Sequence, residues 1–264
     1  MTLFAAHRGG AALWPENSLL AFRNALALGS SLLELDVHAT ADGNAAVIHD
    51  ATLDRTTNAS GPVAGRTAAE LQQARLKAPG GGLTDEGVPM LRDVLALAAP
   101  TSAAMLVEIK TPGPAVTFER RGDAVSVVPG ARYPGLERRV LEDLTVTGMT
   151  ERAMVMAFNP DVIAEVRALG RSTRTVLLVD RQAKDAGLGS EAVVGLATGA
   201  GVNFLGIHQS LCDATLVMAA HVAGLGVGVF TVNEESAMRR LVELGVDVVI
   251  SDRPDLVQRM ERGA

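Results

Sequence analysis

Short runs of β-forming residues alternate with helical stretches along nearly the whole chain, and this alternation constrains the fold most. Eight runs are predicted as strands: Thr2–Ala6, Leu32–Val37, Met105–Ile109, Met154–Ala157, Thr175–Val179, Phe204–Ile207, Gly228–Val232 and Asp247–Ser251. Apolar strands that alternate with helices are typical of a parallel sheet covered by helices. Eight of them favour closure into an α/β fold of the (β/α)8 TIM-barrel type. An open, doubly wound sheet is the alternative.

Helices are expected between these strands, at Ser18–Leu28, Leu91–Ala98, Leu136–Val146, Pro160–Leu169, Ala214–Ala223 and Glu234–Leu244. Gly29, Gly170, Gly224 and Gly245 stand where a helix C-cap needs a left-handed residue before the next strand. The segment Thr67-Ala68-Ala69-Glu70 has the spacing of a capping box, which predicts the start of a further short helix.

One apolar run, Ala45–Ile48, breaks the alternation because it follows the second strand after only Ala41-Asp42-Gly43-Asn44. This connection is too short for the helix that joins two parallel strands. The Asp-Gly pair is a strong turn signal, so the run is interpreted as an antiparallel hairpin return. Such a return would bring His49 back roughly opposite Asp36.

The 264 residues are expected to form a single domain, because barrels of this kind reach about 250 residues as one domain. The glycine-rich stretch Pro79–Val88 is expected to be a loop. A small insertion at about 112–134 follows the third core strand, and within it Ala115–Val128 alternates around Gly122-Asp123 like a hairpin. This insertion would overhang the mouth of the barrel.

Composition excludes several classes of partner and location. The net charge of −6 argues against binding nucleic acid or anionic membrane through overall charge. The sequence contains neither an uninterrupted apolar run of about 18 residues, which a membrane span needs, nor the layout of a signal peptide at its start. Cys212 is the single cysteine, so the fold does not depend on a disulfide. We therefore expect a cytoplasmic protein without stable membrane association.

Chemically useful side chains gather at the ends of the first strands, where barrel enzymes build their active sites. The first strand ends in His7 and Arg8, and the glycines that follow allow a ligand to approach closely. Histidine can transfer protons and arginine can hold phosphate. A surface turn that contains a histidine is the alternative interpretation of this segment alone.

Acidic side chains form a second group of candidates. Glu34 and Asp36 face the same side of the second strand, Glu108 and Lys110 repeat this arrangement on the third strand, and His49 ends the hairpin return. Buried carboxylates are costly without compensation, so they indicate either a divalent cation or ion pairs with Arg or Lys. Oxygen ligands suit Mg2+ or Ca2+ better than zinc, because the histidines would be needed for proton transfer.

Short motifs along nearly the whole chain resemble, in order and spacing, the signature of the glycerophosphodiester phosphodiesterase family. They are His7-Arg8-Gly9, Pro15-Glu16-Asn17-Ser18, Glu34-Leu35-Asp36-Val37, Asp42-Gly43, His49-Asp50, Leu53-Asp54-Arg55-Thr56, Glu108-Ile109-Lys110, Thr231-Val232-Asn233, Gly245-Val246-Asp247 and Ser251-Asp252-Arg253-Pro254. The resemblance implies a phosphoric diester hydrolase that converts small-molecule glycerophosphodiesters to sn-glycerol 3-phosphate and an alcohol, in phospholipid and glycerol metabolism.

The resemblance also implies catalytic and metal-binding roles. His7 and His49 would be the acid/base pair, and one divalent cation, Mg2+ or Ca2+, would bind Glu34, Asp36 and Glu108. In the related mechanism the glycerol 2-hydroxyl attacks phosphorus and expels the alcohol. Water then opens the cyclic phosphate, and the two histidines exchange roles between the steps.

Further roles are implied for residues around this centre. Arg8 and Lys110 would contact the phosphate, and Glu16 and Asn17 resemble residues that orient the site. The pair Asn17-Ser18 also suits a helix N-cap. Phe230 precedes Thr231-Val232-Asn233 where the family commonly has tryptophan, so a smaller aromatic side chain would line the site.

Several alternatives remain open at this point. The insertion could form a lid, although a solvated hairpin is the simpler interpretation. His38 is expected to point away from the neighbours of Asp36, while His208 and His221 lack partners in the local sequence. Two other functional classes are a catalytically silent barrel that binds phosphate and a related phospholipase that acts on lipid phosphodiesters.

Overall fold

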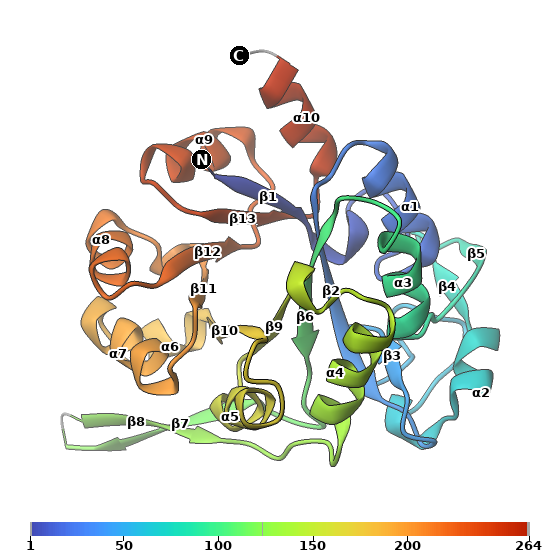
Figure 1. The fold of residues 1–264 in the computed structure, drawn as a ribbon, viewed down its shortest axis with the longest axis horizontal. Coiled ribbons are helices and arrows are strands. Elements are labelled where there is room, and N and C mark those ends of the chain that lie inside the picture. The colour runs from blue at the N-terminus through green and yellow to red at the C-terminus, as the bar shows by residue number, and fades with distance from the viewer. Residues whose placement is uncertain (1, 123, 263–264) are drawn as a thin grey trace.

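The computed structural model describes residues 2–122 and 124–262. A nine-stranded sheet closes on itself at the centre of the molecule (Figure 1). In chain order its strands are β1 (Leu3–Ala6), β2 (Leu32–Ala39), β3 (Ala45–Val47), β6 (Ala104–Ile109), β9 (Ala153–Ala157), β10 (Arg174–Val179), β11 (Phe204–His208), β12 (Gly226–Phe230) and β13 (Val248–Ser251). Because β1 pairs in parallel with both β13 and β2, a barrel of eight parallel strands is closed. The predicted (β/α)8 barrel is confirmed and the open sheet is excluded.

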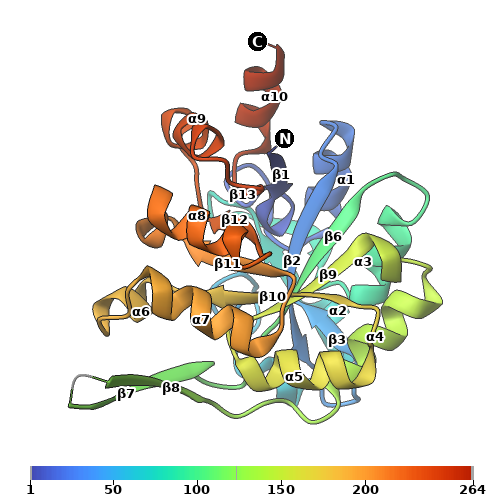
Figure 2. The same ribbon diagram turned by 60° about the vertical axis from the view of Figure 1, so that its left-hand side comes forward.

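Helices surround the barrel (Figures 1 and 2). They are α1 (Leu19–Ala27), α2 (Ala68–Gln73), α3 (Leu91–Ala98), α4 (Leu136–Val146), α5 (Pro160–Leu169), α6 (Arg181–Asp185), α7 (Ser190–Ala200), α8 (Ala214–Val222), α9 (Glu235–Glu243) and α10 (Pro254–Arg262). Across the described ranges, no helix is both long and apolar enough to span a bilayer.

The expected helices are confirmed, and Thr67 caps α2 in the predicted capping box. The helices α6, α7 and α10 were not predicted. For α7 the sequence gives a weak signal, because Gly195 and Gly199 lie inside the helix and its N-cap, Gly189, offers no side chain to the first turn. Packing against the barrel, rather than intrinsic propensity, therefore determines this helix.

Three of the four expected C-cap glycines adopt a left-handed conformation, with φ of 93° at Gly29, 76° at Gly224 and 80° at Gly245. The expectation for Gly170 is wrong, because its φ is −128°. A Cβ at this position would lie 2.8 Å from Thr173 Oγ1. Close packing, not backbone conformation, requires glycine there.

Alternation along β2 decides which of its side chains enter the barrel. Leu33 and Leu35 belong to the core between strands and helices. Leu32 belongs instead to the cluster inside the barrel, which comprises Ala5, Leu32, Leu106, Met156, Val176, Leu178, Val248 and Ile250. Glu34 and Asp36 share the face of Leu32 and therefore point into the barrel, above this apolar floor.

The hairpin return after β2 is confirmed. β3 pairs antiparallel with β2, with Val37 opposite Val47, and the Ile48 N–H donates to the Asp36 carbonyl at 3.0 Å. Gly43 has a φ of 76° in the connecting turn. The return thus delivers His49 to the same end of the barrel as Asp36.

Two further hairpins extend from the barrel. β4 (Arg75–Lys77) pairs with β5 (Leu83–Gly87), so the expectation of a loop over Pro79–Val88 is wrong for its second half. Pairing with β4 overrides a local sequence, Leu-Thr-Asp-Glu-Gly, that disfavours a strand.

The second hairpin, β7 (Val116–Arg121) with β8 (Ala124–Pro129), is the one expected within Ala115–Val128. Asp123, in the predicted turn, lies outside the described residues. The hairpin extends past α5 toward α6 (Figures 1 and 2). It faces the C-terminal end of β10 across a cavity and therefore borders the mouth at one side.

Candidate active site

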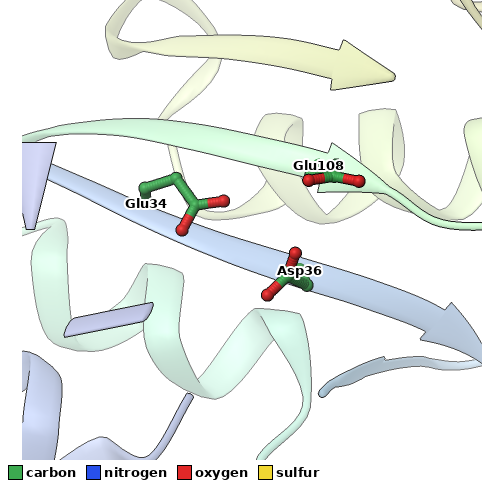
Figure 3. A group of neighbouring side chains, drawn as sticks. All are labelled: Glu34, Asp36 and Glu108. Atoms are coloured by element: carbon green, nitrogen blue, oxygen red, sulfur yellow. The ribbon is translucent and has the colours of Figure 1, made fainter. Parts of the chain in front are cut away.

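Three carboxylates converge on β2 and β6 (Figure 3). Asp36 lies opposite Glu108 in the parallel register, and Glu34 is on the same face of β2 as Asp36. One oxygen of each carboxylate lies within 4.8 Å of the others. The exposed fractions of the three residues are 0% for Asp36, 6% for Glu108 and 2% for Glu34. A buried group of oxygen ligands at this spacing is suited to a hard divalent cation.

Two basic side chains accompany the carboxylates. Lys110 Nζ lies 3.0 Å from Asp36 Oδ1 and 2.6 Å from Glu108 Oε1, and Arg8 Nε lies 3.2 Å from Asp36 Oδ2. Both oxygens that face Lys110 are buried, and each keeps a further lone pair beside this one ammonium group. Their unused acceptor capacity fits a bound cation. Ion pairs and a divalent cation were alternative explanations for the buried carboxylates. At this site the two are compatible.

Burial and neighbouring charges set the ionisation of the carboxylates. Burial, together with the negative charge of Asp36, raises the pKa of Glu34 to about 7. Burial would also raise the pKa of Asp36, but Lys110 and Arg8 outweigh it and hold that pKa well below its usual range. Asp36 is thus kept as a carboxylate, whereas Glu34 carries a charge that its surroundings disfavour.

His7 follows β1 and is held by a carboxylate from the opposite end of the chain. Its Nδ1 lies 2.6 Å from Asp252 Oδ1, and Asn233 Nδ2 donates to Asp252 Oδ2 at 2.7 Å. Nε2 faces the acidic cluster, 3.8 Å from Glu34 Oε2. Burial would lower the pKa of His7, but Glu34 and Asp252 raise it overall. The contact with Asp252 fixes the ring so that Nε2 is the nitrogen presented to a ligand.

His49 is held in the same way by its neighbour Asp50, whose Oδ1 lies 2.7 Å from Nδ1. Arg55 donates to both oxygens of Asp50 and to both oxygens of Glu16. Glu16 also accepts a hydrogen bond of 3.0 Å from Arg8 Nη1. Burial lowers the pKa of His49. An ionic network therefore links the loop after β1 to the loop that carries this histidine.

Arg8 and Asn17 have left-handed backbones, with φ of 52° and 58°, which are uncommon outside glycine. The Asn17 N–H donates to the Arg8 carbonyl at 2.9 Å, and Asn17 Nδ2 donates to Asp36 Oδ2 at 2.9 Å. Ser18 is the N-cap of α1, because its hydroxyl oxygen accepts from the Ala21 N–H. Asn17 therefore contacts the carboxylate cluster, while its neighbour Ser18 caps α1.

The expectation that His38 points away from the neighbours of Asp36 is wrong, because it lines a cavity with Glu108 and Lys110. His38 and Asp36 are two positions apart on one strand, so they share a face, and His38 lines the same cavity as His49. Burial lowers the pKa of His38 to about 4, so its ring is neutral. The Tyr133 hydroxyl donates to His38 Nδ1 at 2.9 Å, and Nε2–H donates to the His49 carbonyl at 3.0 Å. This chain of hydrogen bonds ties the end of the insertion to the backbone of His49.

Tyr133→Phe should lower the free energy of unfolding by about 1–2 kcal/mol, because it leaves the buried acceptor on His38 without its donor. Urea denaturation measures the change. The control is the same substitution made in a His38→Leu variant, where the Tyr133 hydroxyl has no imidazole acceptor. There, Tyr133→Phe should lower the free energy of unfolding much less. Equal costs in the two backgrounds would show that the hydroxyl does not act through His38.

A cavity of about 420 Å³ opens beside the cluster, and His49, Glu108, Lys110 and Phe158 are among its lining residues. Phe158 directly follows β9, and Lys110 Nζ lies 5.9 Å from the centre of its ring. Phe230 contacts Phe158 edge-on, with 5.8 Å between ring centres. Phe158 therefore supplies an aromatic wall of this cavity, and Phe230 packs against that ring.

The structure brings together His7, Arg8, Glu16, Asn17, Glu34, Asp36, His49, Glu108 and Lys110. Sequence reasoning gave no role to Asp50, Asp252 or Phe158. Phe158 and Asp252 directly follow the barrel strands β9 and β13, and Asp50 directly follows His49. This position was the available signal, because barrel sites are assembled from such segments.

Comparisons with known proteins find relatives that match nearly the whole chain. The model of the glycerophosphoryl diester phosphodiesterase family matches residues 7–256. A glycerophosphodiester phosphodiesterase of Bacillus altitudinis is 30% identical, over 97% of this chain and 96% of the relative. One from Caldanaerobacter subterraneus is 29% identical, over 99% and 98% of the two chains.

Solved structures show the same fold. A structure from Agrobacterium tumefaciens that carries the family name has a TM-score of 0.84 at 26% identity and covers all of both chains. A phosphodiesterase from Oleispira antarctica, in complex with the product sn-glycerol-3-phosphate, has a TM-score of 0.78 at 24% identity, covering 99% of this chain and 96% of the other. Together with the match of the family model over most of the chain, these likenesses show that the chain belongs to the glycerophosphoryl diester phosphodiesterase family.

Proposed function

We propose that this protein hydrolyses glycerophosphodiesters to sn-glycerol 3-phosphate and an alcohol, with one divalent cation, Mg2+ or Ca2+, at Glu34, Asp36 and Glu108. The observation that carries the proposal is the buried carboxylate cluster with a histidine on either side. The reaction would serve phospholipid and glycerol metabolism, in a single cytoplasmic domain.

The residues of the cluster fit the cation for reasons of charge and geometry. Three carboxylate groups lie within reach of one ion, and the two oxygens that face Lys110 keep lone pairs that this one ammonium group does not use. When bound, the cation would supply positive charge that stabilises the negative phosphoryl oxygens in the transition state. Arg8 and Lys110 keep Asp36 ionised and so prepare it as a ligand.

The chain's own residues would bind the phosphate and move the protons. Arg8 and Lys110 place positive charge at the edge of the cluster, where it can hold phosphate oxygens. As the glycerol 2-hydroxyl oxygen bonds to phosphorus and the bond to the alcohol oxygen breaks, one histidine accepts the hydroxyl proton and the other protonates the alcohol. Water then opens the cyclic phosphate at the 2-oxygen, and His7 and His49 exchange roles.

The contacts of the histidines favour catalysis over a silent phosphate-binding barrel. Each histidine has its Nδ1 on a carboxylate, Asp252 or Asp50, which leaves Nε2 for proton transfer. Phosphate binding alone needs positive charge and hydrogen-bond donors, which Arg8 and Lys110 already offer, whereas proton transfer in both steps calls for two imidazoles with a free Nε2.

Removal of the divalent cation should abolish activity. In excess chelator, release of glycerol 3-phosphate from glycerophosphocholine and glycerophosphoethanolamine should fall by at least about 10³-fold, since the phosphoryl charge would lose its main stabilisation. Adding back Mg2+ or Ca2+ should restore the rate, and Na+ at the same ionic strength is the control. Full activity in chelator would refute the metal site, and cleavage of neither diester under any metal would refute the proposed reaction.

A further inference from the structure

A second cavity, of about 380 Å³, lies between the β7–β8 hairpin and the barrel. Its lining is almost entirely apolar and includes Val116, Phe118, Val127, Phe158, Leu178 and Leu196. Among the described residues around it, Asp180 and Gln182 are the polar ones. Pockets of this size that are mainly apolar are typical of sites for small ligands.

The hairpin is built to present an apolar face to this cavity. Phe118 lies opposite Val127 in the antiparallel register, and both remain only half-buried. Thr117, the neighbour of Phe118, is on the opposite face and is exposed. Arg120 Nη2 donates to the Ala186 carbonyl at 2.7 Å, so a hydrogen bond anchors the hairpin beside α6. The apolar side chains are thus held over a space that they do not fill.

The apolar cavity adjoins the candidate active site. Ala115 and Phe158 line both cavities. Lys110 Nζ, a proposed phosphate contact, lies 5.9 Å from the centre of the Phe158 ring. A ligand whose phosphate is held at Lys110 can therefore extend past Phe158 into an apolar environment.

We propose that this cavity binds one short alkyl or acyl chain of the substrate, so that the preferred diesters carry a chain. This inference rests on the proposed diesterase function. One chain is expected because the 2-hydroxyl must remain unesterified to attack phosphorus. The chain is therefore either on the alcohol or on the 1-position of the glycerol. In both cases the P–O bond to the alcohol breaks, and water supplies a hydroxyl to phosphorus and a proton to the alcohol.

Three substrates test the proposal: glycerophosphocholine, glycerophospho-N-hexanoylethanolamine and 1-hexanoyl-glycerophosphocholine. At least one of the chain-bearing diesters should have a kcat/KM at least about tenfold above glycerophosphocholine, because methylene groups leave water on binding. The preferred one identifies which side of the phosphate faces the cavity. If glycerophosphocholine is cleaved and neither chain improves kcat/KM, the inference is wrong while the proposed function stands.

Matched variants on the hairpin locate the effect. Val127→Asp should lower kcat/KM for the preferred chain-bearing diester about tenfold more than for glycerophosphocholine, because it places a charge in the apolar lining. Thr117→Asp, on the outer face of the hairpin, should leave the ratio of the two kcat/KM values unchanged. Equal losses for both substrates in Val127→Asp would overturn the inference.

A binding measurement keeps the test independent of turnover. Octyl phosphate should bind the wild-type protein at least about tenfold more tightly than glycerol 3-phosphate by calorimetry, and Val127→Asp should remove this preference. Equal affinities in the wild-type protein would overturn the inference even if the protein cleaved none of the three diesters.

Discussion

Replacing His7 by alanine should reduce kcat for glycerophosphodiester hydrolysis by about 10³-fold, and His49→Ala should have an effect of the same order. Each substitution removes a proton donor or acceptor that both steps need. KM should change little, because the proposed phosphate contacts of Arg8 and Lys110 remain. Release of glycerol 3-phosphate, followed under saturating substrate and metal, measures the loss.

His221→Ala is the matched control for these variants. His221 is also paired with an aspartate, with Nε2 2.9 Å from Asp247 Oδ2, but both side chains are exposed, one in α8 and the other directly before β13. Its removal should leave kcat within about twofold of wild type. The variants at His7 and His49 should still bind the cation, since the carboxylates are intact. Wild-type activity of the His7→Ala variant would refute the two-histidine mechanism.

The fold could be predicted because its information is local. Each core strand is a compact apolar run, and the alternation within β2 already places Glu34 and Asp36 on the inner face. The same alternation also places His38 on the face of Asp36. The sequence therefore already contained the information that His38 points toward the site. The Asp42-Gly43 turn was sufficient to predict the return that carries His49.

The parts that could not be predicted depend on contacts between distant segments. Asp252 and His7 are 245 positions apart in the sequence and come into contact because β13 pairs with β1. The local sequence around either residue does not predict this contact. The contact between Tyr133 and His38 likewise depends on how the insertion returns to the barrel. Phe158 was missed because the direction of a ring after a strand end depends on packing.

Asp36→Asn and Glu34→Gln should both abolish binding of the cation, yet they should change the stability of the metal-free protein in opposite directions. Asp36 faces Lys110 at 3.0 Å and Arg8 at 3.2 Å in a buried site. Loss of its charge leaves both cations poorly compensated, so the free energy of unfolding should fall by about 3 kcal/mol. Asparagine is nearly isosteric, so the effect would come from charge and not from packing.

Glu34 stands in the opposite electrostatic situation. Its Oε2 accepts the backbone N–H of Arg8 at 3.0 Å, and a glutamine oxygen can accept the same bond. What Glu34→Gln removes is repulsion between buried carboxylates, so the free energy of unfolding in chelator should rise by roughly 1 kcal/mol. Urea denaturation in chelator and calorimetric titration with Ca2+ measure the two properties separately. Destabilisation by both substitutions in chelator would mean that Glu34 serves the fold, whereas opposite signs would mean that it is kept, at a cost in stability, for the cation.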